Sequence, residues 1–474
     1  MANGNKRILS IDALRGLAVV GMVLCASIGF NSGLPAWMFH AQTPPPTYAF
    51  NPDLPGLTWV DLVFPFFLFP LGAAFPLAMR KKLERGTGRW KVFLGLVKRW
   101  VILTCFALVL GNSYDIAAST RPAWSVNLFR IAVWGALFLS LVRIGEASPE
   151  ESGKGIGGWL RRNRGKVVNF AGLAALVGLG FIKTGWFGVG IDKYNSDIIM
   201  MILANVALAG GTIWMLTMNR QGLRWLIFGF IAMVKALSSY YPQVLEFIPE
   251  CSACGWFFKW EYLQYLLIAI PGSVVGDVLL ENFRRGKEGT FDRRSAWAGF
   301  IALAAMVFQL WGLYTRNVAA DLVVSIILAA CFAALTWKRK DNLTITGNLG
   351  FIFLIAGIVF DPVDGGITKD YCNLSYLFTT CGMAALTNSF FIMLEGNFKK
   401  GCRILVMTGQ NPIIAYTVTS FLIIPVMSLC GIMDGLSALT VGSVFWGMAQ
   451  GIILTALMTA VTCLFTKAQV FWRS

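Results

Sequence analysis

The only histidine in this sequence, His40, is the residue best suited by type to acid–base chemistry at neutral pH. A free imidazole titrates near about pH 6.5, so it can take up or release a proton under physiological conditions. His40 lies in a proline-rich stretch, residues 31–56, and Asp61 follows at the start of the next apolar segment. The carboxylate of Asp61 could orient the imidazole as the acid of a catalytic triad does. An ordinary loop histidine is an equally good interpretation of these residues taken alone.

Charged residues inside apolar segments are a second candidate for function. Asp12 and Arg15 lie three positions apart, which places them on one face of a helix. Charges in a membrane span are costly and are usually paired or functional. Asp12 and Arg15 could form an ion pair at the membrane surface, or Arg15 could reach a phosphate. Arg99 and Arg130 also lie within apolar segments, and the sequence does not show their partners.

Two later stretches are unusually polar for their surroundings. Residues 361–386 carry Lys369, Ser375 and Tyr376, and residues 409–416 carry Asn411. These side chains could line a cavity, although Ser and Thr within spans also serve ordinary helix packing. The sequence contains no P-loop, dinucleotide-binding fingerprint, GxSxG elbow or zinc motif. We therefore expect no metal, and we find no support for ATP-driven transport.

The elements that must position these residues are long apolar segments. The chain has 474 residues, of which 56% are hydrophobic and only 14% are charged. Many apolar runs reach about 18 residues, the length needed to cross a hydrocarbon core. We predict an all-α, polytopic integral membrane helix bundle with about 11 to 14 transmembrane helices. The expected crossings are approximately residues 8–30, 57–79, 91–111, 123–143, 167–185, 197–218, 223–241, 261–280, 295–314, 318–336, 345–360, 374–395, 404–430 and 438–466.

The formal net charge of +16 is explained by topology better than by nucleic-acid binding. Lys and Arg concentrate in every second loop, as the positive-inside rule describes. This pattern puts both termini in the cytosol and puts the loop 31–56, which has no Lys or Arg, on the outer side. The excess charge also suits anionic lipid headgroups. We expect no nucleic-acid partner.

The chain is predicted to form a single transmembrane domain over residues 1–474. Its parts are the N-terminal helices 8–143, a basic cytosolic loop 144–166 and the remaining helices 167–474. The outer loop 31–56 is long for a segment without secondary structure, and such loops are usually functional. Its prolines restrict the backbone and favour a fixed, extended path.

The motifs of this chain resemble the heparan-α-glucosaminide N-acetyltransferase family and its bacterial relatives. The resemblance is strong over about residues 8–80 and patchier beyond. The matching motifs are IDALRG at residues 11–16, His40-Ala41, Gly56-Leu57-Thr58, DLVFP at residues 61–65, NLFRI at residues 127–131, Leu374-Ser375-Tyr376 with Gly382, and Gly409-x-Asn411-Pro412 with Tyr416.

The resemblance implies a transmembrane acetyltransferase, in which acetyl-CoA binds from the cytosol and the acetyl group reaches an amine or hydroxyl of a sugar on the outer side. It implies that His40 is catalytic, as base or acyl carrier, together with Asp61. It also implies that Arg15 and Arg130 are core residues of the site. From these residues and the two polar stretches together, we expect Arg15, Arg130 and Asn411 to bind the donor, and Asn31, Lys369, Ser375 and Tyr376 to bind the acceptor.

The sequence departs from the family at two places. The lysosomal enzyme of the family has an asparagine near the end of the first helix, where this chain offers only Ser27 or Asn31. The stretch 42–53 is also longer here, so the acceptor can differ.

Two other functions remain open. A secondary transporter would suit the number of spans and the helices that Pro and Gly interrupt, and the third alternative is a membrane scaffold without activity. A transporter should have two pseudo-symmetric halves, whereas an acyltransferase should have a tunnel from a basic mouth to His40. We expect a multi-pass protein of a bacterial inner membrane, as a monomer or a homodimer. The acceptor, N- versus O-acetylation, and an acetyl-histidine intermediate versus direct transfer stay open.

Overall fold

The computed structural model describes residues 8–142, 163–241, 254–286, 292–397 and 402–472. In these residues the regular structure is helical, apart from one isolated bridge between Val142 and Trp472. Fourteen helices of the described ranges are long and apolar enough to cross a membrane. The predicted polytopic all-α bundle is therefore confirmed. Most of the basic loop predicted at 144–166 lies outside the described residues.

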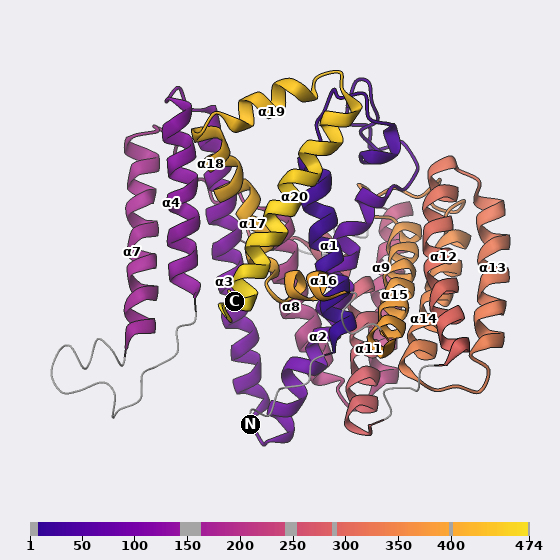
Figure 1. The fold of residues 1–474 in the computed structure, drawn as a ribbon. Coiled ribbons are helices and arrows are strands. Elements are labelled where there is room, and N and C mark those ends of the chain that lie inside the picture. The colour runs from indigo at the N-terminus through magenta and orange to yellow at the C-terminus, as the bar shows by residue number, and fades with distance from the viewer. Residues whose placement is uncertain (1–7, 143–162, 242–253, 287–291, 398–401, 473–474) are drawn as a thin grey trace.

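The long helices run side by side, and the termini of most of them lie at two opposite ends of the bundle (Figure 1). The α-helices are α1 Leu9–Ser27, α2 Trp59–Glu84, α3 Arg89–Tyr114, α4 Ala123–Leu141, α7 Arg164–Gly185, α8 Ile198–Leu216, α9 Gln221–Tyr240, α11 Leu266–Arg284, α12 Arg293–Thr315, α13 Val318–Leu335, α14 Asn342–Phe360, α15 Leu374–Asn397, α16 Arg403–Gln410, α17 Pro412–Val418, α18 Ile424–Leu429, α19 Ile432–Thr440 and α20 Val444–Lys467.

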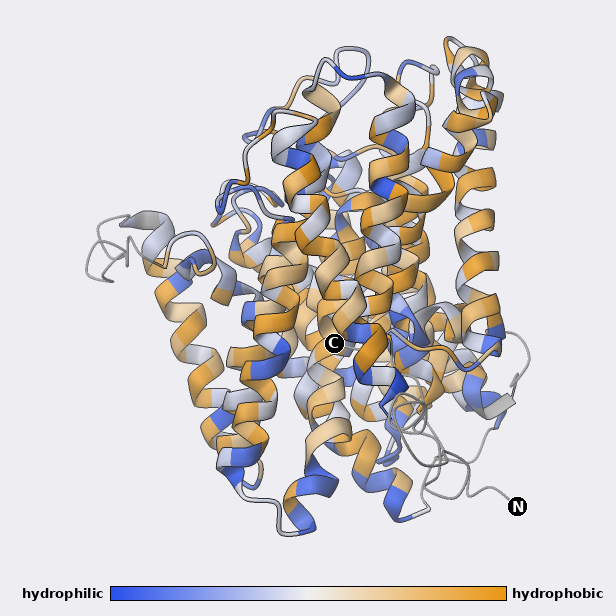
Figure 2. Cartoon of the chain, turned by 90° about the vertical axis from the view of Figure 1, so that its left-hand side faces the viewer, coloured by the Kyte–Doolittle hydropathy of each residue, from blue (hydrophilic) through white to orange (hydrophobic). Residues whose placement is uncertain are grey.

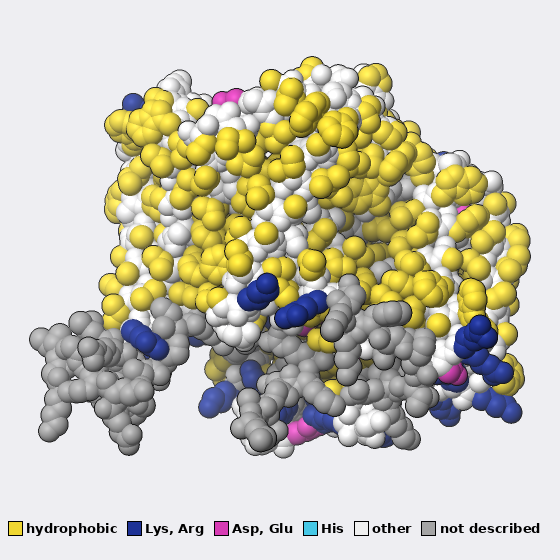
Figure 3. Space-filling model, viewed as in Figure 1, with side chains coloured by type: hydrophobic (Ala, Val, Ile, Leu, Met, Phe, Trp, Pro, Cys, Tyr) yellow, Lys and Arg dark blue, Asp and Glu magenta, His cyan; other side chains and the backbone are white. Residues whose placement is uncertain are grey.

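The two ends of the bundle differ in charge. We call the end where α2 passes into α3 the basic end, because Lys and Arg occur repeatedly between residues 80 and 89. In Figure 3 the Lys and Arg side chains gather toward this lower end, below a broad apolar belt. Figure 2 shows the same change along single helices, from apolar middles to polar ends. We call the opposite end, which carries residues 28–58, the far end.

Helices α1 and α2 are packed by direct backbone contact with partners that are distant in sequence. A Cβ atom on Gly72 of α2 would lie 1.9 Å from the carbonyl oxygen of Ala269 in α11. A Cβ atom on Gly16 of α1 would lie 1.9 Å from the carbonyl oxygen of Leu405 in α16, and one on Gly409 would lie 1.8 Å from that of Asp12. Small residues allow such close approach of helices in a membrane. These contacts fix the two helices that carry the main sequence motifs.

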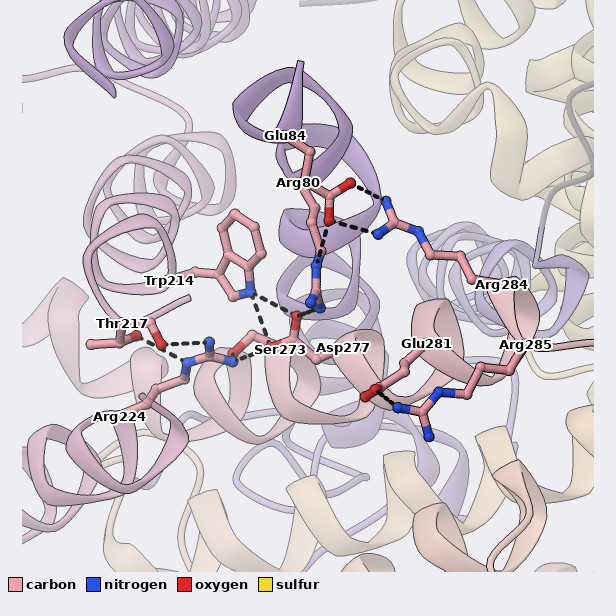
Figure 4. A network of polar contacts seen from close by, with 10 residues as sticks. All are labelled: Arg80, Glu84, Trp214, Thr217, Arg224, Ser273, Asp277, Glu281, Arg284 and Arg285. Carbon is pink, nitrogen blue, oxygen red and sulfur yellow. Dashed lines mark hydrogen bonds and ion pairs between the residues drawn. The ribbon is translucent and has the colours of Figure 1, made fainter. Parts of the chain in front are cut away.

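A network of charged residues, buried around Asp277 and exposed at its edge, joins four helices at the basic end, and Arg80 of α2 reaches Asp277 at 3.6 Å (Figure 4). Arg224 of α9 is fully buried and pairs with Asp277 of α11 at 2.7 Å. The indole of Trp214 in α8 donates to the same carboxylate at 3.2 Å. Nearby, Arg284 of α11 forms a two-bond pair with Glu84 of α2 at 2.6 and 2.7 Å. The network therefore locks α2, α8, α9 and α11 together.

The expected crossing at residues 404–430 differs from the structure. The chain forms α16, breaks at Asn411, and continues as α17, a π-helical turn at Thr419–Ile423 and α18. Pro412 begins α17, where a missing backbone N–H costs nothing. The expected crossing at 438–466 likewise begins later, at Val444, because α19 is a separate short helix that lies across the far end (Figure 1). Hydropathy alone did not reveal these breaks.

Candidate active site

His40 and Asp61 are directly hydrogen-bonded. The Nδ1 atom of His40 lies 2.6 Å from Oδ1 of Asp61. The Asp61 side chain is completely buried, whereas 37% of the His40 side chain is exposed. One edge of the imidazole is therefore held by a carboxylate while part of the ring stays accessible, as an orienting acid and a catalytic histidine require.

The start of α2 fixes the carboxylate of Asp61. Thr58 and Asp61 form a capping box, in which the backbone N–H of Thr58 donates to Oδ2 of Asp61 at 2.9 Å. The hydroxyl of Thr58 donates to the carbonyl oxygen of Phe39 at 2.8 Å, which fixes the residue before His40. One carboxylate oxygen of Asp61 thus caps the helix, and the other binds the imidazole.

Lys369 completes a charged cluster with these two residues. Its Nζ atom lies 3.1 Å from Nδ1 and 3.3 Å from Nε2 of His40, and 3.9 Å from Oδ1 of Asp61. We call His40, Asp61 and Lys369 the far-end cluster. An ammonium beside the ring is a ready donor to a negative charge that develops there.

The segment that carries Lys369 is held on both sides. The carboxylate of Asp361 accepts the backbone N–H of Ile367 at 2.8 Å and pairs with Arg316 through two bonds of 2.8 Å. The carbonyl oxygen of Ile367 accepts the N–H of Gly56 at 2.9 Å, which joins this segment to the His40 loop. These bonds place Lys369 against a residue 329 positions away.

Tyr376 and Ser375, two of the predicted acceptor-binding residues, lie at the start of α15 and make different contacts. Tyr376 donates its hydroxyl to the backbone carbonyl of Asp61 at 2.9 Å, so it supports the cluster from α15. Ser375 is buried, and its hydroxyl donates to Asn373 at 2.9 Å. The roles of both in acceptor binding stay predictions.

Asn31 lies in a turn at the far end. It is exposed, has a φ of 60°, and accepts the N–H of Gly442 with its backbone oxygen at 2.9 Å. Its backbone N–H also faces the hydroxyl of Tyr48 at 3.3 Å. These contacts use the backbone of Asn31, and a role for its side chain stays a prediction.

Arg15 belongs to a different part of the bundle. Its guanidinium contacts Asp12 at 3.3 Å and the carbonyl oxygens of Gly409 at 3.3 Å and Pro70 at 3.5 Å. The predicted ion pair with Asp12 is therefore present. Gly409 is the residue whose backbone touches α1, so Arg15 lies where α1, α2 and α16 meet.

The other two predicted donor-binding residues have separate surroundings. The guanidinium of Arg130 lies 5.9 Å from the centre of the Tyr114 ring, and its buried Nε atom has no hydrogen-bond partner in the described part of the chain. Asn411 is fully buried and uses its side chain to hold the C-terminal segment, through bonds to Thr466, Val470 and Trp472. A donor-binding role for either stays a prediction.

Two residues near these sites were not assigned from the sequence. Cys25 of α1 lies within electrostatic range of Lys369 and Asp61. Arg99 lies within electrostatic range of Arg15, and no described residue forms a hydrogen bond with its buried Nε atom. Its position in an apolar segment was the only signal in the sequence, and that signal did not show which residue it faces.

Asp370 adds a titratable group beside the far-end cluster. The pKa of its carboxyl is raised, first because neighbouring groups partly shield it from water and further because the Asp61 carboxylate lies near. The ammonium of Lys369 opposes this rise. The protonation of Asp370 therefore depends on the charges of the far-end cluster.

The fold and the far-end cluster define a multi-pass helical membrane protein with a histidine held between a buried carboxylate and an ammonium. A family model described as "Domain of unknown function (DUF5009)" matches residues 7–279. The match covers more than half of the 474 residues, and the chain belongs to this family.

Two named proteins are similar to part of the chain. Over 106 residues it is 30% identical to the heparan-alpha-glucosaminide N-acetyltransferase of Homo sapiens and 33% identical to that of Mus musculus. Each match covers 22% of this chain and 14% of the length of the relative. The relationship expected from the motifs is confirmed, and it concerns a small part of those longer proteins.

Proposed function

We propose that this protein is a transmembrane acetyltransferase. It takes the acetyl group of acetyl-CoA at the basic end and transfers it to an amine or hydroxyl of a carbohydrate at the far end. The observation that carries the proposal is the hydrogen bond of 2.6 Å between His40 and the buried Asp61, with Lys369 beside the ring. The similarity to two N-acetyltransferases supports the same reaction class.

The far-end cluster suits acyl transfer. Attack on a thioester requires a base that removes the proton of the attacking amine or hydroxyl, or a nucleophile that carries the acyl group. With Nδ1 of His40 bound to Asp61, the lone pair of Nε2 can take that proton. The Lys369 ammonium would stabilise the negative charge that forms on the carbonyl oxygen. Asn31, Ser375 and Tyr376 are the proposed acceptor-binding residues.

The arginines fit a polyanionic donor. Arg15 and Arg99 lie close enough for the two cations to repel each other, and the buried Nε of Arg99 has no acceptor among the described residues. Phosphate oxygens are strong acceptors for guanidinium groups. We therefore add Arg99 to Arg15, Arg130 and Asn411 as proposed donor-binding residues. Acetyl-CoA supplies the activated acyl group, and the residues of the chain orient it.

The test is acetyl transfer by purified protein in lipid vesicles, with radiolabelled acetyl-CoA and a panel of amino sugars. We expect the parent to transfer label and His40→Ala to lose at least about 100-fold in turnover. Binding of CoA, measured separately by calorimetry, should stay unchanged in His40→Ala because Arg15 and Arg99 are intact. Equal transfer by the parent and His40→Ala would refute the catalytic role of His40. A parent that does not bind CoA would refute the proposal that the protein is an acetyltransferase.

A secondary transporter is the second candidate. The broken stretch Arg403–Leu429, with its π-helical turn, is the observation that favours it, because interrupted helices surround binding sites in transporters. Vesicles with reconstituted protein should then accumulate a labelled sugar without acetylating it. We propose that the protein is located in a bacterial inner membrane, as a monomer or homodimer.

A further inference from the structure

Asp321 is a buried acid that forms no ion pair within 4.0 Å among the described residues. It lies in the first turn of α13, and its exposed fraction is 0%. Neither of its carboxylate oxygens has a hydrogen-bond partner among the described residues. An ionised carboxylate without donors in a membrane is among the costliest arrangements that a protein can hold. Its persistence in the fold therefore needs an explanation.

The surroundings of Asp321 are built to receive its side chain. The carboxylate lies against the backbone of Gly312 in α12, where an added Cβ atom would be 1.6 Å from Oδ1. Gln309, one turn earlier in α12, donates its amide to the backbone oxygen of Asp321 at 3.1 Å and to the hydroxyl of Ser325 at 2.6 Å. The amide oxygen of Gln309 is buried and likewise has no hydrogen-bond partner among the residues that the structure describes.

The small polar site between α12 and α13 therefore has a surplus of acceptors. Within the described ranges, both Asp321 oxygens and Oε1 of Gln309 have no donor, while the amide N–H groups of Gln309 already donate to Asp321 and Ser325. A single added proton on Asp321 would convert one acceptor into a donor and remove the buried charge.

The charged groups that act on Asp321 are Arg316 at the end of α12 and Asp361 at the end of α14. Arg316 is the cation that could neutralise it, but both terminal nitrogens of Arg316 bind Asp361 at 2.8 Å. Two carboxylates thus compete for one guanidinium, and Asp361 holds it in this structure.

We propose that Asp321 is a proton-binding site within the membrane, protonated while Arg316 is paired with Asp361. A proton from water forms an O–H bond with one oxygen of the carboxylate, and the site becomes neutral. When the proton leaves, the Asp321 carboxylate attracts Arg316 away from Asp361. A metal cation fits less well, because hard cations take about six or more oxygen ligands.

The competition of Asp321 and Asp361 for Arg316 is linked to the far-end cluster by hydrogen bonds. Asp361 also accepts the N–H of Ile367, and the carbonyl of Ile367 accepts the N–H of Gly56 in the His40 loop. Lys369 follows two positions after Ile367. The proton on Asp321 therefore keeps Asp361 and Arg316 together and preserves the anchor of the segment that carries Lys369. The proton site itself does not depend on the acetyltransferase proposal.

Infrared difference spectroscopy of the full chain in lipid bilayers tests the proposal, because a protonated carboxyl absorbs at a different frequency from a carboxylate. At neutral pH we expect one protonated carboxyl in the parent that Asp321→Asn lacks and Asp321→Glu shifts. Asp277→Asn is the matched control, since Asp277 is also buried but is paired with Arg224. It should leave the band unchanged. Asp361→Asn frees Arg316 and should weaken the Asp321 band.

Three results would overturn the proposal. One is a parent spectrum identical to that of folded Asp321→Asn at neutral pH. Another is a band that Asp361→Asn leaves at full intensity, which would remove Arg316 from the competition. The third is a band that disappears when sodium replaces potassium at constant pH, which would make the site a sodium site. Folding of each variant is checked by its elution as a single species in detergent.

Discussion

The Nδ1 atom of His40 and the Oδ1 atom of Asp61 lie 2.6 Å apart, one in an irregular loop and the other in the first turn of a buried helix. The second oxygen of Asp61 is used by the helix cap. The carboxylate therefore cannot rotate without breaking either the helix cap or the hydrogen bond to the imidazole. Helix α2 thus fixes the orientation of His40, although His40 itself lies in a loop.

Asp61→Asn should leave the protein folded and reduce acetyl transfer by about 10²- to 10⁴-fold, because the amide stabilises the charged imidazole less well. The measurement is turnover at saturating acetyl-CoA. Asp53→Asn serves as the control, since Asp53 is an exposed residue of the same loop whose carboxylate accepts a hydrogen bond from the Tyr371 hydroxyl at 2.7 Å. Equal losses in both variants would point to a general disturbance of the loop.

Lys369→Met should reduce turnover by roughly 10²-fold, the effect of losing one donor to a developing negative charge. Lys369→Arg keeps the cation and should retain part of the activity. The comparison is made as kcat against the acceptor KM. A change confined to the acceptor KM in Lys369→Met would assign Lys369 to acceptor binding alone.

Gly16→Ala should destabilise the protein by about 1–3 kcal/mol, because the added methyl group collides with the backbone of α16. Thermal unfolding in detergent measures the effect. Gly135→Ala in α4 is the matched control, since a Cβ atom there meets nothing within 4 Å. Variants of equal stability would show that α1 and α16 can move apart without cost.

Arg224→Ala should cost about 3–5 kcal/mol, because it leaves the buried carboxylate of Asp277 without its closest counter-charge. The double variant Arg224→Met with Asp277→Leu should be more stable than Arg224→Ala, since it removes both charges. Arg285→Ala is the control, because its pair with Glu281 is exposed and should contribute about 0–1 kcal/mol. Stability is again read from unfolding in detergent. A double variant less stable than Arg224→Ala would contradict the argument.

Two acids outside the spans should give opposite pH dependences of stability. The raised pKa of Asp370 means that the folded chain binds an extra proton between the ordinary value of 3.8 and the raised value. Stability from this group therefore falls as pH rises through that window. The pKa of Asp292 is lowered, by its bonds to Ser295 and then by Arg339, so its contribution is present above the ordinary value and is lost as pH falls.

Thermal unfolding of the parent, Asp370→Asn and Asp292→Asn over a series of acidic pH values checks both signs. Asp370→Asn should gain stability over the parent as pH rises, and Asp292→Asn should lose it. Asparagine keeps the cap acceptor at residue 292, so the difference reports mainly the charge. Curves that run parallel to that of the parent would contradict both assignments.

Much of the fold could be predicted from apolar runs, because a membrane requires helices of known length and spaces the basic loops. The breaks at Asn411 and before Val444 could not, since a short interruption hardly changes the mean hydropathy of a long window. The pairing of His40 with Asp61 was also accessible, because both lie in one short motif. The place of Lys369 beside them was not, because it depends on the Arg316–Asp361 pair and the path of a distant loop. Asp321 gave no sequence signal beyond an acid near a helix start.

The backbone contact between Gly16 and residues 405–409 has a consequence for biogenesis. Helix α1 is the first apolar segment in the described chain, yet the helix that it touches most closely follows nearly 400 residues later, as the bond between Arg15 and Gly409 with a separation of 394 residues shows. At about 5–20 residues per second of synthesis, α1 waits for tens of seconds in the bilayer before that surface exists. During this interval its Gly16 face and Arg15 lack the partners that α16 supplies, so the surroundings of Arg15 are completed only after residue 409 has been synthesised.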